Sequence, residues 1–378
     1  MQINQIILKI TSICNLSCKY CYVFNKDDKS YRLQNDVISR DVIDAFIDKL
    51  TDYQKNENNA VATITFHGGE PLMAGKDVVE NIASLIRRQC GEKMQLSIQT
   101  NGTLVDSEWC DIFNRNKISV GISIDGNRRA NRKRVFANQR ETFDKVIGSY
   151  NLLKERGVNV GVLSVISTKC SPIDYYSFLK DYNITHVDCL FPDATYETID
   201  KSSLGIGIWL SQLFDLWFKD NKRPSIRLFE SILKLIFDPF REVGGEMFGS
   251  TTNGVVDINP NGDIDIPDTL KICNKNLISQ KYSIFKNTLQ DICCEKNFKL
   301  FYLSHSEHAL STLCQQCIIK PVCGGGILAH RYSIERGFDN PSVYCYDLFM
   351  IIKHIQNTIC DETDRIKKIQ IEDFKAWH

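Results

Sequence analysis

The sequence lacks net charge, since its 46 Lys and Arg residues balance its 46 Asp and Glu residues. A nucleic-acid partner demands clustered basic charge against the phosphates, so this balance gives no sign of one. The sequence also lacks any apolar run near the roughly 18 residues that span a bilayer. Its first residues have neither the basic segment nor the apolar stretch of a secretion signal. We therefore expect a cytoplasmic protein with no nucleic-acid partner and no membrane contact.

Cysteine, by contrast, is abundant, with 15 residues in the chain. Disulfides are rare in a reducing compartment, where clustered cysteines more often bind metal. A lone cysteine is usually a small buried apolar residue. The lone cysteines are Cys90, Cys110, Cys170, Cys189 and Cys360. Most of the others gather in two clusters, which are therefore the candidate metal sites.

Short apolar runs typical of strands alternate with helix-like stretches through the first half of the chain. The expected strands are residues 6–11, 63–67, 95–100, 118–124, 158–166 and 186–191. The expected helices are residues 36–50, 76–90, 106–115, 142–156 and 174–181. This alternation predicts an α/β fold with a parallel sheet and helices packed outside it. Six such units form a partial, TIM-like (β/α)6 barrel, whose chemistry lies at the carboxyl ends of the strands.

The pattern changes after about residue 200. Two helices are expected at 206–218 and 226–237, a hairpin at 255–264, and a last helix from about Asp347. We therefore divide the chain into a partial barrel (1–200), a helical bridge (201–250) and a small Cys-rich domain with a C-terminal helix (251–378).

The first cysteine cluster follows the first expected strand and consists of Cys14, Cys18 and Cys21. By chance, a C-x3-C-x2-C pattern has an expectation of roughly 0.02 in a chain with this many cysteines. Three thiolates can hold three corners of a [4Fe–4S] cluster and leave the fourth iron open to a ligand. A chance cluster or a structural zinc site is the alternative.

The C-x3-C-x2-C segment resembles the signature of the radical SAM superfamily. The resemblance implies that S-adenosylmethionine chelates the open iron and is cleaved to a 5′-deoxyadenosyl radical. It also implies cofactor contacts: Tyr22 near the adenine, Gly68, Gly69 and Glu70 at the methionine amino group, and Asn101 and Ser123 near the ribose. Arg134 is a candidate partner of the methionine carboxylate. A cation on a solvated basic face is an equally good interpretation of Arg134.

The second cysteine cluster consists of Cys314, Cys317, Cys323 and Cys345. Alone, the C-x2-C-x5-C array also fits a zinc ribbon. Downstream of a radical SAM segment it resembles the SPASM domain, which implies that these four cysteines bind one auxiliary [4Fe–4S] cluster.

A second auxiliary cluster is common in that family, but this chain departs from its pattern. Pro267 and Ile327 stand where the family has two of the ligands. We therefore expect no second auxiliary cluster. The remaining alternative is that it is bound with different spacing, by Cys273, Cys293 or Cys294.

Segments 323–332, 337–345 and 226–231, together with His67, resemble cyclophane-forming radical SAM/SPASM maturases, which act on XYE-type and FxSxx-type precursor peptides. The resemblance implies a carbon–carbon crosslink between a β-carbon and an aromatic ring in a ribosomally made peptide. It also implies an external one-electron donor of the flavodoxin or ferredoxin type. Asp268 is the candidate base, because sulfatase maturases have a catalytic Asp at this place. A turn aspartate after proline is the alternative interpretation.

Three rival functions remain open from the sequence. An anaerobic sulfatase maturase, which oxidises Cys or Ser to formylglycine, shares the barrel and the SPASM domain but normally has all seven SPASM cysteines. A thioether-forming peptide maturase is the second rival. A non-catalytic zinc adaptor is the third, and an anaerobic absorption spectrum distinguishes it. The sequence does not identify the peptide substrate.

Overall fold

The computed structural model describes residues 1–25, 29–56, 61–200, 205–250, 252–274, 282–361 and 368–370. The chain forms two compact units. Unit 1 consists of Met1–Ile124, Asn131–Leu163 and Gly254–Lys299. Unit 2 consists of Asp125–Ala130, Ser164–Asn253 and Leu300–His378. The hairpin region after residue 254 therefore belongs with the barrel strands in unit 1.

Unit 1 is built on a sheet with the strand order β10-β9-β8-β1-β2-β3-β4-β5. The pairs from β8 to β5 are parallel, and the pairs β8–β9 and β9–β10 are antiparallel. The strands are β1 (Gln5–Thr11), β2 (Thr63–Gly68), β3 (Gln95–Thr100), β4 (Ile118–Ser123), β5 (Val160–Val165), β8 (Val255–Ile258), β9 (Asp263–Asp265) and β10 (Tyr282–Ser283). The last residues of β5 fall in unit 2.

The two faces of this sheet differ because side chains alternate along each strand. One face carries the fully buried apolar residues, such as Leu8 of β1 and Phe66 of β2. The other face is polar, and Thr65 and Ser97 hydrogen-bond across it at 2.9 Å. A polar sheet face can hold polar ligands, so it is the face on which a site is expected.

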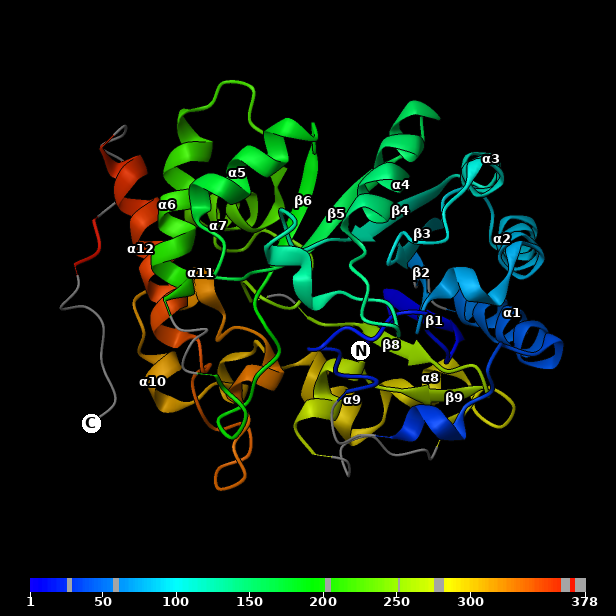
Figure 1. The fold of residues 1–378 in the computed structure, drawn as a ribbon. Coiled ribbons are helices and arrows are strands. Elements are labelled where there is room, and N and C mark those ends of the chain that lie inside the picture. The colour runs from blue at the N-terminus through cyan, green and yellow to red at the C-terminus, as the bar shows by residue number, and fades with distance from the viewer. Residues whose placement is uncertain are drawn as a thin grey trace. The chain divides into compact units, whose positions relative to one another are not determined.

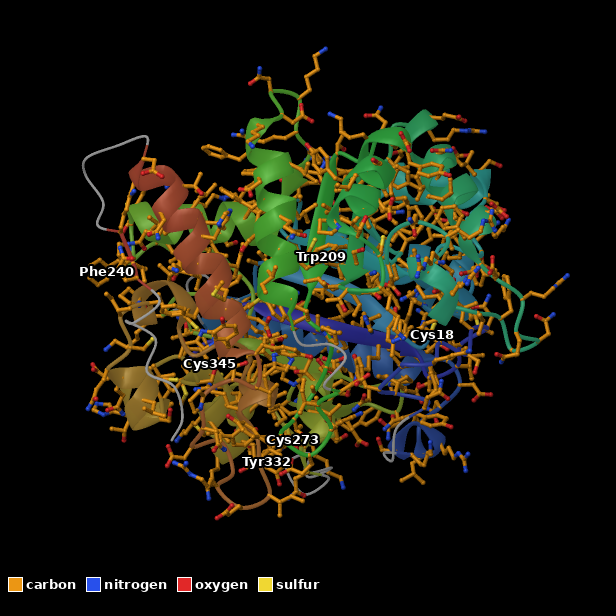
Figure 2. The ribbon with its side chains drawn as sticks, turned by 60° about the vertical axis from the view of Figure 1, so that its left-hand side comes forward. Cys18, Trp209, Phe240, Cys273, Tyr332 and Cys345 are labelled. Carbon is orange, nitrogen blue, oxygen red and sulfur yellow. The ribbon has the colours of Figure 1, made fainter. Side chains whose placement is uncertain are left out.

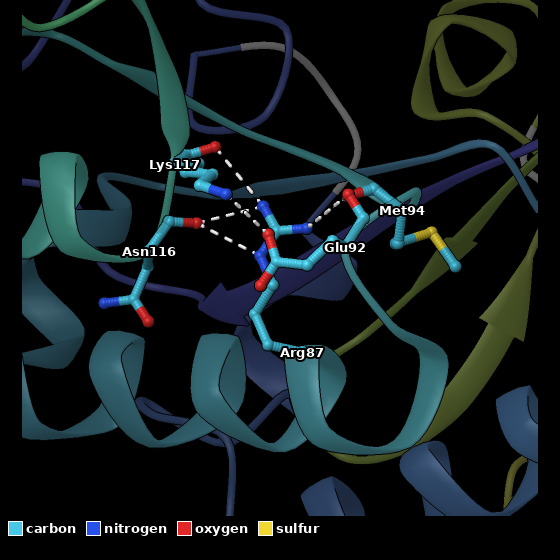
Figure 3. A network of polar contacts seen from close by, with 5 residues as sticks. All are labelled: Arg87, Glu92, Met94, Asn116 and Lys117. Carbon is cyan, nitrogen blue, oxygen red and sulfur yellow. Dashed lines mark hydrogen bonds and ion pairs between the residues drawn. The ribbon is translucent and has the colours of Figure 1, made fainter.

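The helices of unit 1 lie beside the parallel strands, and Figure 1 shows α1, α2 and α3 next to one another along them. Arg87 near the end of α2 donates to the carbonyl oxygens of Met94 at 2.5 Å and Asn116 at 2.9 Å (Figure 3). These two residues lie just before β3 and β4, so Arg87 ties α2 to the amino ends of the strands. The helices are α1 (Arg40–Asn56), α2 (Lys76–Cys90), α3 (Ser107–Arg115), α4 (Phe143–Glu155) and α8 (Leu289–Cys293), with 3₁₀ turns η1 (Ser30–Leu33), η2 (Pro71–Ala74), η3 (Ala130–Lys133) and η5 (Asp268–Ile272).

Unit 2 contains the parallel strand pair β6 (His186–Leu190) and β7 (Ser225–Ile226). Helices α6 and α12 pack side by side (Figure 1). A Cβ on Gly207 of α6 would lie 2.4 Å from the Asp347 carbonyl oxygen, so glycine is what permits this close approach. The helices are α5 (Pro172–Asp181), α6 (Ile206–Lys219), α7 (Arg227–Phe237), α10 (Thr312–Gln315), α11 (Lys320–Cys323) and α12 (Cys345–Cys360), with 3₁₀ turns η7 (Glu307–Ala309) and η8 (Leu328–Arg331); α9 (Lys296–Tyr302) spans the boundary of the units.

The predicted α/β fold with a parallel sheet and external helices is confirmed. The first predicted helix begins four residues late, at Arg40, because the preceding segment pairs with β1. Val37 forms a bridge to Thr11, and the Ile38 N–H donates to the Ile10 carbonyl at 3.0 Å. The three-part division at residues 200 and 250 stays a prediction. No helix in the described ranges is long and apolar enough to cross a bilayer.

Candidate active site

The three cysteines of the first cluster lie in the loop that follows β1, where Figure 2 labels Cys18. The Cys21 N–H donates to the Cys18 carbonyl at 3.0 Å, which turns the loop between them. The Ser17 N–H donates to the Val135 carbonyl at 2.8 Å, which attaches the loop to a second segment. Cys14, Cys18 and Cys21 are all half-buried free thiols. The backbone therefore fixes the loop, while each of the three cysteine residues keeps part of its surface exposed.

The glycine pair after β2 brings the backbone directly against this loop. A Cβ on Gly68 would lie 2.0 Å from the Thr11 carbonyl oxygen, and one on Gly69 would lie 2.1 Å from that of Ile13. The Gly69 N–H donates to Thr11 at 3.0 Å. Gly68 also has a φ of 138°, which disfavours any other residue. The pair therefore positions the backbone that enters Cys14.

Replacing Gly69 by alanine is expected to destabilise the apo-protein by about 1–3 kcal/mol, the usual cost of overpacking. The added methyl group must displace the backbone of Ile13, so iron incorporation should fall as well. Gly148 in α4 is the matched control, because nothing lies within 4 Å of its Cβ position. Gly148→Ala is expected to raise stability slightly. Urea unfolding that showed equal effects for both variants would contradict this role of Gly69.

Glu70 connects the ends of β2 and β3 while it is almost fully buried. Its carboxylate accepts from the Thr100 hydroxyl at 2.6 Å and from the Asn101 N–H at 2.7 Å. The Asn101 side chain in turn donates to Asn15 at 2.9 Å and accepts from Thr103. Glu70 and Asn101 thus hold the cysteine loop in place. Direct contact of either side chain with a cofactor stays a prediction.

Arg134 lies beside the cysteine loop, whereas its neighbours Arg132 and Lys133 are exposed. Its Nη1 donates to the Tyr20 hydroxyl at 2.6 Å. A half-buried guanidinium that is held by a hydrogen bond differs from an exposed cation on a solvated face. Such a group suits an anionic ligand. Its assignment to the methionine carboxylate stays a prediction.

The structure also places Ser123 and Tyr22, whose contacts with the cofactor stay predictions. Ser123 ends β4, and its hydroxyl accepts from Gln99 at 2.7 Å on the polar face of the sheet. Tyr22 is half-buried in the turn after Cys21.

The first cysteine cluster fits a cationic group bound by thiolates. Burial raises the pKa of the Cys14 thiol to about 12, and nearby Glu70, Cys18 and Cys21 add to the rise. A thiolate at Cys14 is therefore unfavourable without a compensating positive charge, and bound iron supplies that charge. The residues present therefore fit a [4Fe–4S] cluster.

A buried group of charges lies on the polar side of β1, β8 and η5. Lys9 Nζ lies 2.9 Å from an Asp257 carboxylate oxygen and 2.5 Å from one of Asp268. Lys271 Nζ lies 2.6 Å from the other Asp268 oxygen. Asn259 accepts from Lys9 at 3.2 Å. Asp268 thus forms ion pairs with two lysines. The interpretation of Asp268 as a turn aspartate does not account for these ion pairs.

The charges of this group set the protonation state of Asp268. Burial would raise its pKa, but Lys9 and Lys271 outweigh burial and hold the pKa well below its usual range. Burial raises the pKa of Asp257 to about 6, although Lys9 opposes the rise. His67, opposite Lys9 on β2, is uncharged at neutral pH, because burial and Lys9 lower its pKa to about 4. Asp268 is therefore the carboxylate that is fully ionised.

Sequence reasoning missed Lys9 and Asp257 as parts of the site. The available signal was a single charged residue inside each of two mainly apolar strands, Lys9 in β1 and Asp257 in β8. Their pairing depends on β8 lying next to β1, which joins residues 250 positions apart. No local pattern predicts that neighbourhood.

The second cysteine cluster lies in unit 2, where three short segments bring its members together. Cys314 is in α10, Cys323 is in α11, and Cys345, which Figure 2 labels, is the first residue of α12. Burial raises the pKa of Cys345 to about 12, and Cys314 and Cys317 raise it further. The pKa of Cys323 is raised by burial and by the three other cysteines. The four cysteines therefore lie near one another in a partly buried site that fits a bound iron–sulfur cluster.

Within the described residues, no group of three or more His, Cys, Asp or Glu side chains is placed to hold a single metal ion. Thiolates that bind a [4Fe–4S] cluster lie farther apart than the ligands of one ion, because each binds a different iron.

The cysteines outside the two clusters include one that is clearly part of a helix contact. Cys293 of α8 is buried, and its sulfur lies 3.7 Å from the Tyr53 hydroxyl of α1 and 3.8 Å from the Leu289 carbonyl. Cys294 next to it is exposed, and Cys273 is half-buried. A role of Cys293 as a ligand would require breaking the α1–α8 contact.

Known proteins similar to this chain identify its family. The sequence model of the Radical SAM superfamily matches residues 8–168. A serine-type anaerobic sulfatase-maturating enzyme of Bacteroides thetaiotaomicron is 31% identical over 382 residues, covering 92% of this chain and 87% of the relative. The chain belongs to the radical SAM superfamily.

A second relative and two solved structures also match more than 90% of this chain. A cysteine-type anaerobic sulfatase-maturating enzyme of Clostridium perfringens is 27% identical over 366 residues, covering 91% of this chain and 93% of the relative. The structure of native anSMEcpe with bound AdoMet has a TM-score of 0.82 at 24% identity and covers 96% of this chain and 100% of that one. Streptococcus suis SuiB bound to precursor peptide SuiA has a TM-score of 0.63 at 18% identity, covering 91% and 76%. Both structures share the fold.

The prediction of a cyclophane-forming radical SAM maturase is wrong. The relatives that cover 91% and 92% of the chain are named sulfatase-maturating enzymes. Two of the segments that suggested cyclophane formation, residues 323–332 and 337–345, have packing roles next to the cysteines of the second cluster. A Cβ on Gly324 would lie 1.8 Å from the Gly249 carbonyl oxygen, and Asn340 donates to the Arg331 carbonyl at 3.0 Å. Such residues hold the cysteines in position, so their presence does not identify the product.

Proposed function

We propose that this radical SAM enzyme oxidises a cysteine or serine side chain of a peptide segment to formylglycine. The observation that carries the proposal is the similarity to serine-type and cysteine-type anaerobic sulfatase-maturating enzymes along almost the whole chain. A related fold, described as anSMEcpe with bound AdoMet and Cp18Cys peptide, supports a peptide as the substrate.

The cofactors are assigned to the two cysteine sites. Cys14, Cys18 and Cys21 would hold a [4Fe–4S] cluster with one iron open to S-adenosylmethionine. When bound, this pair supplies a carbon radical able to remove a hydrogen atom. The chain's own candidates for binding and orienting S-adenosylmethionine are Tyr22, Gly68, Gly69, Glu70, Asn101, Ser123 and Arg134.

The four cysteines of unit 2 would hold one auxiliary [4Fe–4S] cluster, which can accept the second electron of the oxidation. We propose no second auxiliary cluster, because Pro267 and Ile327 offer no thiolate. An external one-electron donor of the flavodoxin or ferredoxin type would start each turnover.

Asp268 is proposed as the base of the reaction. After the β-carbon has lost one hydrogen atom, loss of one electron leaves the substrate hydroxyl or thiol strongly acidic. Loss of its proton gives the aldehyde from serine and a thioaldehyde from cysteine, which water then hydrolyses to the aldehyde with release of hydrogen sulfide. A carboxylate of low pKa is basic enough to accept the substrate proton, and an ionised one is required. Lys9 and Lys271 keep Asp268 ionised, so they act as positioning residues.

The direct test is an anaerobic assay of the reconstituted enzyme with two peptides that differ only in a central Cys or Ser. At least one peptide is expected to give a product that reacts with hydrazines, together with one 5′-deoxyadenosine per product. The serine peptide should become lighter by two hydrogens. A peptide with Ala at that position is the control and should stay unchanged. Cleavage of S-adenosylmethionine without any aldehyde from either peptide would contradict the proposal.

A further inference from the structure

Arg331 is a fully buried arginine beside the second cysteine cluster. It lies at the end of η8 and has no exposed surface. Nη2 donates to the Ser304 carbonyl at 2.7 Å, and Nη1 donates to the Ala309 carbonyl at 3.3 Å. Nη1 is also 3.4 Å from the Cβ position of Gly325, two residues after Cys323. The guanidinium is therefore placed among the segments that carry the cysteines.

This buried cation has no carboxylate partner in the described part of the chain. Its two hydrogen bonds go to neutral carbonyl groups, and its Nε is buried without a hydrogen-bond partner there. A buried charge without compensation is strongly unfavourable. A negative charge is therefore expected close by.

Thiolates that bind a cluster at the four-cysteine site would supply that charge. Burial lowers the pKa of Arg331 to about 10, and the groups that oppose this fall are Cys314 and Cys323. His305 lies near Arg331, but burial and Arg331 lower the pKa of His305 to about 4. His305 therefore adds no charge at neutral pH. Arg331 thus carries the positive charge, and the four-cysteine site would carry the negative one when it binds the cluster.

We propose that Arg331 is the counter-ion of the four-cysteine site and that it raises the reduction potential of the cluster bound there. The proposal rests on the proposed function in assigning a [4Fe–4S] cluster to this site. Reduction adds a negative charge, which a nearby buried cation stabilises. Arg331 thereby makes the site a better acceptor for the electron released by the substrate.

A purely structural role for Arg331 predicts a different outcome. Its two bonds to carbonyl groups also fix the chain on the way to Cys314, and this function needs shape and hydrogen bonds more than charge. Arg331→Met removes the charge, whereas Arg331→Lys keeps the charge and changes the shape. The two variants together separate the roles.

The test uses the full chain with Cys14, Cys18 and Cys21 replaced by Ala, so that the auxiliary cluster alone is observed. Iron content should approach about four atoms per chain. In an anaerobic redox titration followed by electron paramagnetic resonance, Arg331→Met should lower the equilibrium constant for reduction on the order of tenfold, a shift of about 59 mV to lower potential for one electron. Arg331→Lys keeps the charge, so its reduction potential should stay close to that of the parent chain.

Arg87→Met is the matched control, because Arg87 also donates to backbone carbonyl groups but lies in α2 of unit 1 (Figure 3). It should leave the potential unchanged. An iron-loaded Arg331→Met chain with the original potential would overturn the proposal. If Arg331→Met loses its iron, retention by Arg331→Lys supports the counter-ion and loss by both variants overturns it. Absence of iron in the parent chain would contradict the auxiliary cluster itself.

Discussion

Replacing Cys14, Cys18 and Cys21 by alanine is expected to reduce 5′-deoxyadenosine formation to the level measured without protein. The loop keeps its backbone bonds to neighbouring segments, so the fold should survive while the iron ligands are lost. Each single replacement should have the same effect, because three thiolates are needed to leave only one iron open. The measurement is chromatography of S-adenosylmethionine products after anaerobic reconstitution with dithionite.

Cys90→Ala is the matched control for these variants. Cys90 is a half-buried free thiol at the end of α2 and belongs to neither cluster. It should leave cofactor cleavage intact. Cleavage at the parent rate by the triple alanine variant would exclude the assignment of the first cluster.

Asp268→Asn is expected to lower aldehyde formation by about 10²–10⁴-fold, the usual contribution of a general base. The amide keeps the shape of the side chain but cannot accept the substrate proton. Cleavage of S-adenosylmethionine should continue, because the cysteine loop is unchanged. The measurement compares 5′-deoxyadenosine with hydrazine-reactive peptide in the same reaction.

Asp257→Asn is the control for Asp268, since both carboxylates pair with Lys9. Removing Asp257 leaves Lys9 and Lys271 on Asp268, so product formation should be largely kept. Equal losses in the two variants would mean that the charge of the group matters and that Asp268 is not the base.

The pH dependence gives a second readout for the same group. Asp268 has a lowered pKa in the folded chain, so it is ionised throughout the neutral range and product formation should not fall between pH 8 and about 5 on its account. Lys271→Met removes one of the two cations that lower this pKa. Its product formation should therefore begin to fall at a higher pH than in the parent enzyme.

Much of unit 1 follows from local patterns in the sequence. The expected helix at 76–90 matches α2, and the expected strand at 95–100 matches β3, because alternation and 3.6-residue periodicity both record burial on one face. The cysteine loop could also be predicted from a local pattern, because ligands that lie in one turn must be close together in the sequence.

What could not be predicted depends on contacts between distant segments. The pairing of β8 with β1 places Asp257 beside Lys9, and neither residue signals the other. Arg331 belongs to a segment that looked like a product-specific motif, whereas its burial and its carbonyl partners indicate a role in holding the cysteines. Short motifs near metal ligands therefore say more about the site than about the substrate.

The most direct test of the central claim follows one hydrogen atom. A cysteine or serine peptide with deuterium at the β-carbon of the target residue is incubated anaerobically with the reconstituted enzyme and S-adenosylmethionine. With two deuterium atoms at that carbon, the account predicts 5′-deoxyadenosine that carries one deuterium, in step with an aldehyde that keeps the other. If 5′-deoxyadenosine forms without deuterium while the peptide keeps both labels, the side chain is not the site of hydrogen abstraction and the account is contradicted.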